Sequence, residues 1–267
     1  MIISASYRTD AAFCIDQLIS TISAARERGE PIEGAVIWTR KPESIFEIGL
    51  TTYLQEAGIP CVIHVSLTDY GEVGLEAQTP PLWARVTSVK QLSSRVGWDR
   101  VIWRYDPIIL GVHNPSGNRY PMDTGWHAEK ISEIGSRLRG RVSHCVTSIM
   151  YPYRHVRARL EEASVPPIDY MPSPERIRGI LRVVKEFTER EEIPLRYCGP
   201  LPGIKGRDIL DELEIPSAHC VDASLFGLEP DPANLRPGCS CDRSVDVGDY
   251  DTCGRGCLFC YANQGRY

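Results

Sequence analysis

The stretch Ala35-Val36-Ile37-Trp38-Thr39 is short and nearly continuously apolar, and stretches of the same type recur along the chain. The others are Ile2–Ser6, Cys61–Leu67, Arg100–Tyr105, Val142–Met150, Leu195–Cys198 and His219–Ala223. Parallel strands that are covered on both faces have this continuous apolar pattern, whereas half-exposed strands alternate. The sequence therefore predicts seven parallel strands.

Segments with helical periodicity lie between these runs. Apolar stripes are formed by Phe13, Leu18, Ile19 and Ile22, by Leu82, Val86, Val89 and Leu92, and by Ile177, Ile180, Leu181 and Val184. Gly29 is predicted to end the first helix, and Ser173-Pro174-Glu175 to begin the third. Seven strand–helix units predict an α/β fold, a (β/α) barrel that is TIM-like or partial. A Rossmann sheet would need a glycine-rich loop after the first strand, and the sequence has none.

Composition narrows the function classes. The chain has 267 residues, 42% of them hydrophobic, and a net charge of −5, which disfavours a general nucleic-acid or membrane-surface binder. The apolar runs are too short for a transmembrane helix, and Met1–Ser6 lacks the features of a signal peptide. Five of the ten cysteines follow residue 238, which favours a cytoplasmic metal site over secreted disulfides.

The chain is predicted to form one structural unit with two parts. Residues 1–226 form the barrel, and residues 227–267 form a linker and a cysteine-rich segment. The linker, Gly227–Gly238, contains three prolines. The cysteine-rich segment is too short for a hydrophobic core of its own, so we expect it to pack on the barrel around a metal.

The segment from Cys253 to Cys260 carries the strongest chemical signal. Cys253, Cys257 and Cys260 have the spacing C-x3-C-x2-C, with glycines in the first gap and Phe259 before the last thiol. Three thiolates so spaced favour an iron–sulfur cluster with one open iron. Zinc is the alternative, with Cys239, Cys241 and two of the other three as ligands. Cys239 and Cys241 are also candidates for a fourth cluster ligand, a second metal site, a redox pair or structural packing.

The cysteine spacing, with an aromatic residue before the last thiol, resembles the signature of radical S-adenosylmethionine (SAM) enzymes. More broadly, the chain resembles an uncharacterised prokaryotic family, a domain of unknown function with radical-SAM-like C-terminal cysteines. This resemblance rests on Ile3–Asp10, Ile37–Pro42, Val101–Pro107 and the tail from Asp246 to Asn263. Tyr7 and Arg255 depart from the family, which tends to have arginine and histidine there. The resemblance implies a [4Fe–4S] cluster, bound SAM and an electron donor such as flavodoxin or ferredoxin.

The cysteine loop of radical SAM enzymes follows the first strand, whereas here it follows all the others. Circular permutation reconciles the two orders. Ser244–Val247 would then form the first strand of the barrel, beside Ile2–Ser6. The cysteine loop would lie at the C-terminal mouth of the barrel, where active sites of this fold collect.

Polar residues follow the predicted strands and form a mixed-charge ring at this mouth. Candidates for cofactor binding are Ser6, Arg8, Asp10, Thr39 and Lys41, and candidates for catalysis are Arg104, Asp106 and His64. Such a ring suits a zwitterion such as SAM, because a carboxylate needs a cation and an ammonium needs a carboxylate. Each has a structural alternative. Asp10 is a possible helix N-cap, Arg104 and Asp106 a possible ion pair, and His64 a possible core residue. Cys14, Cys61, Cys145, Cys198 and Cys220 are expected to be core residues.

These features predict a radical-SAM-like enzyme acting on an unidentified small molecule. Three alternatives remain at this point. The first is non-radical C–S cleavage or alkyl transfer from SAM at the cluster. The second is a nucleic-acid repair or binding protein, and the third a zinc-stapled protein or a redox iron–sulfur protein.

Overall fold

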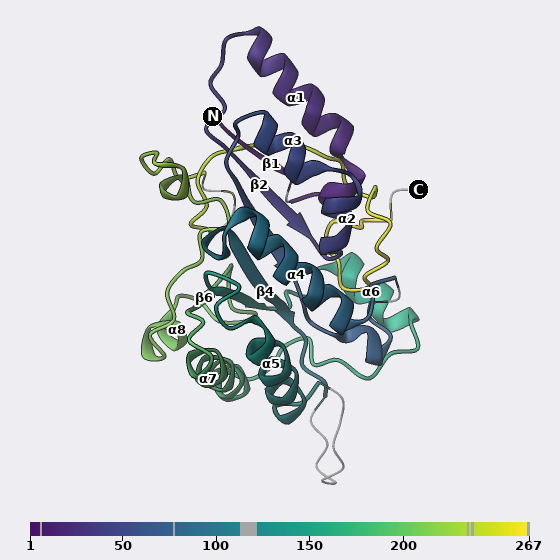
Figure 1. The fold of residues 1–267 in the computed structure, drawn as a ribbon. Helices are drawn as coiled ribbons and strands as arrows, with labels where there is room; N and C mark the ends of the chain where they lie inside the picture. The colour runs from purple at the N-terminus through teal and green to yellow at the C-terminus, as the bar shows by residue number, and fades with distance from the viewer. Residues whose placement is uncertain (6, 77, 113–121, 234, 236–237, 266–267) are drawn as a thin grey trace.

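The fold is a seven-stranded sheet covered by helices, as given by a computed structural model that describes residues 1–5, 7–76, 78–112, 122–233, 235 and 238–265 (Figure 1). The strands are β1 (Ile2–Ala5), β2 (Gly34–Thr39), β3 (Cys61–Ser66), β4 (Val101–Ile108), β5 (Cys145–Ile149), β6 (Leu195–Tyr197) and β7 (Val245–Asp246). The α-helices are α1 (Ile15–Glu27), α2 (Pro42–Glu47), α3 (Leu50–Glu56), α4 (Leu82–Val96), α5 (Thr124–Leu138), α6 (Arg154–Glu162), α7 (Pro174–Arg190) and α8 (Asp208–Glu212). Short 3-10 helices are η1 (Ala11–Phe13), η2 (Tyr70–Val73), η3 (Trp98–Arg100) and η4 (Ala223–Phe226).

All the strand pairs are parallel, and the order is β6-β5-β4-β3-β2-β1-β7. The last strand in sequence therefore lies at the edge beside the first, with Ile3 opposite Val245 and Ser4 opposite Asp246. This pairing confirms the predicted position of Ser244–Val247. It also brings the chain that follows β7 to the same end of the sheet as the carboxyl ends of the other strands.

The sheet is open, so the prediction of a barrel holds only as an α/β fold with a parallel sheet. In the described residues β6 and β7 are the two edges and do not pair with each other. The prediction of a strand at His219–Ala223 is wrong. Beyond β6 the chain forms only an isolated bridge in the described residues, between Tyr197 and Ser217, and residues 219–223 are not part of the sheet. The chain then turns, and the Asp222 side chain accepts the Ser224 N–H as the N-cap of η4.

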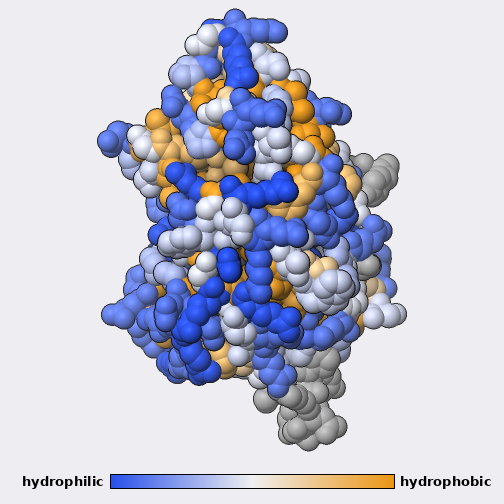
Figure 2. Space-filling view, viewed as in Figure 1, coloured by the Kyte–Doolittle hydropathy of each residue, from blue (hydrophilic) through white to orange (hydrophobic). Residues whose placement is uncertain are grey.

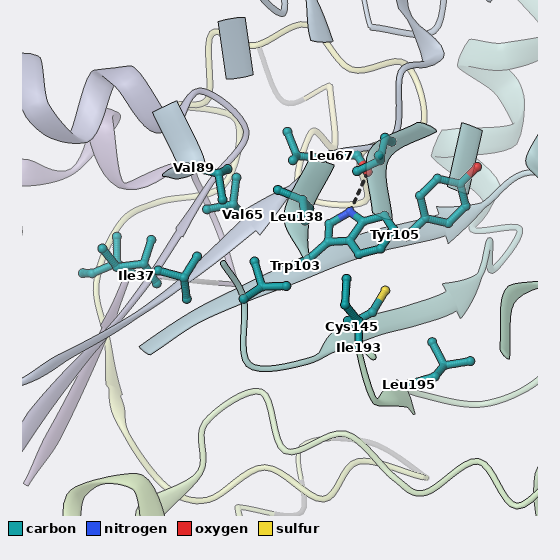
Figure 3. Close-up of a cluster of buried hydrophobic side chains, with 14 of the residues drawn as sticks. Ile37, Val65, Leu67, Val89, Trp103, Tyr105, Leu138, Cys145, Ile193 and Leu195 are labelled. Atoms are coloured by element: carbon teal, nitrogen blue, oxygen red, sulfur yellow. Dashed lines mark hydrogen bonds between the residues drawn. The ribbon is translucent and has the colours of Figure 1, made fainter. Parts of the chain in front are cut away.

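The helices α1, α3, α4, α5 and α7 cover the outer face of the sheet (Figure 1). Their outward surface is largely hydrophilic (Figure 2). Trp103 lies in the core between these helices and the sheet, fully buried, and its indole N–H donates to the Leu67 carbonyl at 3.1 Å (Figure 3). The predicted N-cap is confirmed, because the Ser173 hydroxyl accepts the Arg176 N–H at the start of α7.

The inner face of the sheet is covered by the chain that leads to the C-terminus. Five inward strand residues pack against five from this segment: Ile2, Val36, Val62, Ile102 and Val146, with Ala218, Cys220, Val221, Ala223 and Cys241. Gly34 makes this approach possible, because a Cβ there would lie 2.1 Å from the Phe226 ring. The part of the predicted linker around Pro232 pairs with Asp242 and thus belongs to this cover.

No helix among the described residues is long and apolar enough to cross a membrane.

Candidate functional site

A cavity of about 770 Å³ lies at the carboxyl ends of the strands, between the sheet and the C-terminal segment. Its wall contains seven of the ten cysteines: Cys198, Cys220, Cys239, Cys241, Cys253, Cys257 and Cys260. Polar residues from the strand ends, among them Arg8, Asp10, Thr39, Arg104 and Asp106, line the same cavity. The predicted mouth of the fold is therefore where cysteines and charged residues meet.

The backbone of the cysteine loop is attached to the segment that follows η2. Cys257 forms an antiparallel bridge with Glu76, and the Leu258 N–H donates to the Leu75 carbonyl at 3.0 Å. Gly256 has a φ of +67°, which a residue with a side chain rarely adopts, so the loop depends on glycine at this point. Burial raises the pKa of the Cys257 thiol to about 12, although the Arg40 guanidinium opposes this shift.

A buried charge network lies beneath the loop. Both Arg40 and Arg85 pair with the carboxylate of Glu76, which has no exposed side-chain surface. The Thr68 hydroxyl also donates to Glu76, and the Arg40 guanidinium lies 4.9 Å from the centre of the Phe259 ring. Arg40 thus holds the Phe259 ring in place, and its charge opposes the rise in the pKa of Cys257.

Helix α6 holds the other side of the loop. The Arg159 guanidinium donates to three carbonyl oxygens, those of Leu258 at 2.7 Å, Cys260 at 2.6 Å and Asn263 at 2.7 Å. The imidazole Nε2 of His155 lies 2.9 Å from the Tyr261 carbonyl oxygen. Figure 1 shows the C-terminal segment running beside α6. These carbonyls lie outside any helix or strand, so Arg159 supplies hydrogen bonds that regular secondary structure would otherwise give them.

Asp10 is committed to protein partners. Its carboxylate accepts the Ala12 N–H as the N-cap of η1, and also the Thr39 hydroxyl and the Arg40 N–H. The Arg255 guanidinium binds both of its oxygens, at 3.2 and 3.3 Å. With five donors on one carboxylate, Asp10 and Thr39 position the cysteine loop against η1 and β2 rather than present free oxygens to a ligand.

Arg104 and Asp106 form the predicted ion pair. Arg104 is 2% exposed, its Nε–H donates to Asp106 at 3.0 Å, and its guanidinium lies 4.2 Å from the centre of the Trp38 ring. Burial alone would lower the pKa of Arg104, but Asp106 and the nearby thiol of Cys220 raise it well above its usual value. The pair is therefore a fixed charged element in the wall of the cavity.

The other candidate residues do not gather at one place: of those that the structure describes, only Arg8 lines the cavity. Arg8 lines the cavity with a side chain that is 41% exposed, and it pairs with Asp246 at 3.5 Å. Lys41 is outside the residues that line the cavity and pairs with Glu47 at 3.2 Å. His64 is also outside them, 1% exposed, and burial lowers its pKa well below the usual value. Ser6 lies outside the described residues.

Cys239 and Cys241 meet Cys198 and Cys220, not the cysteine loop. The Sγ atoms of Cys198 and Cys220 are 3.4 Å apart, and the Cys220 N–H donates to the Cys241 Sγ at 3.3 Å. The neighbouring Cys241 thiol lowers the pKa of Cys239 to about 6. Cys198 and Cys220 are buried, as expected of core residues. Their contacts with each other and with Cys241 were not predicted. The position of Cys198 directly after β6, at the mouth, was the available signal.

Some buried polar atoms at this end of the cavity lack a hydrogen-bond partner among the described residues. They are the Tyr7 hydroxyl, the Thr9 hydroxyl and the Trp38 indole N–H. Burial and the thiols of Cys241 and Cys220 raise the pKa of the Tyr7 phenol above its usual range. Unpaired polar atoms in a cavity wall are available to a polar ligand.

Within the described part of the chain, no group of three or more His, Cys, Asp or Glu side chains is arranged to hold a single metal ion. The metal ligands named from the sequence thus remain predictions.

Comparison with known proteins gives a family without an assigned activity. No curated protein matches the chain. A family model described as a domain of unknown function (DUF1848) matches residues 16–262, which is nearly the whole chain. The chain belongs to this DUF1848 family.

Proposed function

We propose that this protein is an iron–sulfur enzyme of the radical SAM type, with a cluster held by Cys253, Cys257 and Cys260 and with SAM in the adjoining cavity. The observation that carries the proposal is the placement of these three thiols in the wall of one cavity, with the guanidinium of Arg40 near Cys257 and Cys260. Three cysteines leave one iron of a [4Fe–4S] cluster without a protein ligand. Such a cluster, once reduced, supplies the electron that cleaves SAM to methionine and a 5′-deoxyadenosyl radical.

The donor set and the cavity fit these groups. A cavity of about 770 Å³ is within the range that holds a small organic ligand. The unpaired polar atoms of Tyr7, Thr9 and Trp38 offer hydrogen bonds to ribose and base. Phe259 is 6% exposed and shields the loop from water on the side of Arg40.

The chain's own charges would orient the ligand. Arg8 lines the cavity with a half-exposed side chain and pairs with Asp246 at 3.5 Å. A zwitterion would exchange with this ion pair, with its carboxylate on Arg8 and its ammonium group on Asp246. Arg104 and Asp106 neutralise each other, so they keep the wall polar without adding net charge. Substrate would enter through the open side of the same cavity, in a reducing cytoplasmic environment.

The test is SAM cleavage by anaerobically reconstituted protein. With dithionite and SAM, we expect 5′-deoxyadenosine to form and SAM to shift the cluster's EPR signal. Cys257→Ala should abolish both results. Cys61→Ala is the matched control, because Cys61 lies at the start of β3, away from the cavity, and it should leave both unchanged. A reduced cluster with four cysteine ligands that SAM does not perturb would refute the proposal.

A further inference from the structure

We propose that the cavity holds a second metal centre, bound by the thiolates of Cys198, Cys220, Cys239 and Cys241. This site is distinct from the loop Cys253–Cys260 and does not depend on SAM chemistry. Its ligands are soft thiolates, so it would take either an iron–sulfur cluster or a zinc ion.

The four residues come from three separate segments: Cys198 follows β6, Cys220 lies in the segment that crosses the inner face, and Cys239 and Cys241 precede β7. Their contacts run in sequence, with Cys198 next to Cys220, Cys220 next to Cys241, and Cys241 next to Cys239. All four line the cavity. Burial of small core residues does not by itself require four cysteines to gather in one place.

Hydrogen-bond donors are directed at two of the four sulfurs. The Arg104 guanidinium donates to the Cys220 Sγ at 3.2 Å, and the Cys220 N–H donates to the Cys241 Sγ at 3.3 Å. A neutral thiol gains little from a buried guanidinium, whereas a metal-bound thiolate is stabilised by both donors. Tyr7 adds a buried phenol on the same side. Two of the four sulfurs, those of Cys220 and Cys241, thus already accept hydrogen bonds of the kind that metal-bound thiolates accept.

The four sulfurs do not surround one point, because the described residues contain no group arranged to hold a single metal ion. Rotating one cysteine between staggered χ1 rotamers moves its sulfur by about 3 Å. The four thiols border an open cavity, and the proposed centre requires such rotations to bring the sulfurs around it.

The test separates the two centres by removing one at a time. The variant Cys253→Ala/Cys257→Ala/Cys260→Ala lacks the loop thiols. After anaerobic purification and reconstitution, we expect it to retain metal, either about four iron and four sulfide per chain or about one zinc. Elemental analysis and labile-sulfide measurement distinguish these two forms of the same site. Adding Cys239→Ala/Cys241→Ala should abolish the retained metal, whereas adding Cys61→Ala should not.

A second measurement guards against misfolding of the variants. In the wild-type protein the four thiols should resist alkylation until a chelator removes the metal, and peptide mapping then shows which thiols have become reactive. Absence of iron and zinc in a folded triple variant would overturn the proposal. Equal metal content with and without Cys239 and Cys241 would also overturn it. Neither result depends on SAM cleavage, so failure of this proposal is distinguishable from failure of the proposed function.

Discussion

Glu76 is the residue on which the buried charges beneath the cysteine loop depend. Its carboxylate is fully buried and is shared by Arg40 and Arg85, and the Arg85 side chain is only 1% exposed. The next carboxylate to Arg85 is that of Asp69, at 4.0 Å. Glu76→Gln keeps the size of the side chain and one oxygen for the Thr68 hydroxyl, but it removes the negative charge. Two buried guanidinium groups then lose their common counter-charge.

The expected loss is large because the partners stay buried. Removing one member of a buried ion pair costs about 3–5 kcal/mol, since the remaining charge stays desolvated. For a chain of this length each kcal/mol lowers the melting temperature by roughly 2–4 °C, which gives a decrease on the order of 10 °C. The Glu76 backbone also pairs with Cys257, so we expect the cysteine loop to loosen together with the fold.

The assay is urea unfolding at pH 7, followed by circular dichroism. The control is Glu133→Gln, which breaks an exposed pair with Arg137 at 3.1 Å and should cost about 0.5 kcal/mol. The double variant Glu76→Gln/Arg85→Met should lose less stability than the two single variants combined, because it also removes one unpaired charge. If Glu76→Gln costs less than about 1 kcal/mol, comparable to the control, then a buried counter-charge is the wrong account of Glu76.

Three further predictions follow from individual contacts. Arg159→Ala removes three hydrogen bonds to loop carbonyls, so amide exchange in residues 258–263 should accelerate at least tenfold while exchange in the sheet is unchanged; equal rates in variant and wild type would contradict this role. Burial lowers the pKa of His127 to about 4 from 6.5, so the unfolded chain takes up this proton first and stability should fall by about 3 kcal/mol between pH 6.5 and pH 4. His127→Gln should flatten that part of the pH profile in urea unfolding, and an unchanged slope would refute the assignment. Gly34→Val forces a side chain into the Phe226 ring and should lower the free energy of unfolding by about 2 kcal/mol or more. A change within about 0.5 kcal/mol would show that the segment covering the inner face of the sheet moves aside without loss of stability.

Local sequence pattern predicted the strands well where burial on both faces determines composition. The runs containing β1 to β6 are apolar because helices cover one side and the C-terminal segment the other. His219–Ala223 has the same pattern for a different reason. Val221 and Ala223 are buried against the inner face of the sheet without being part of it, and an apolar run does not distinguish these two situations.

The candidate site was predictable in its location but not in its pairings. Asp10, Thr39 and Arg104 do lie at the mouth, as their positions after strands require. What they bind depends on contacts across the whole chain, such as that between Asp10 and Arg255, which are 245 residues apart. Sequence periodicity carries no information on such contacts, so the commitment of Asp10 to protein partners emerged only with the fold. The same holds for the meeting of Cys198 with Cys220.

The place of the cysteine loop follows from topology rather than from its position in the sequence. β7 runs parallel to β1 at the sheet edge, so the chain leaves β7 at the end where all the other strands finish. Any short segment after Asp246 must therefore lie at the mouth. A two-residue strand is a weak anchor by itself, and side chains reinforce it: Ser4 donates to Asp246 at 2.9 Å, and the Gln17 amide oxygen accepts the Gly248 N–H at 2.7 Å. A strand that comes late in the sequence but lies beside β1 thus brings the thiols that follow it to the mouth.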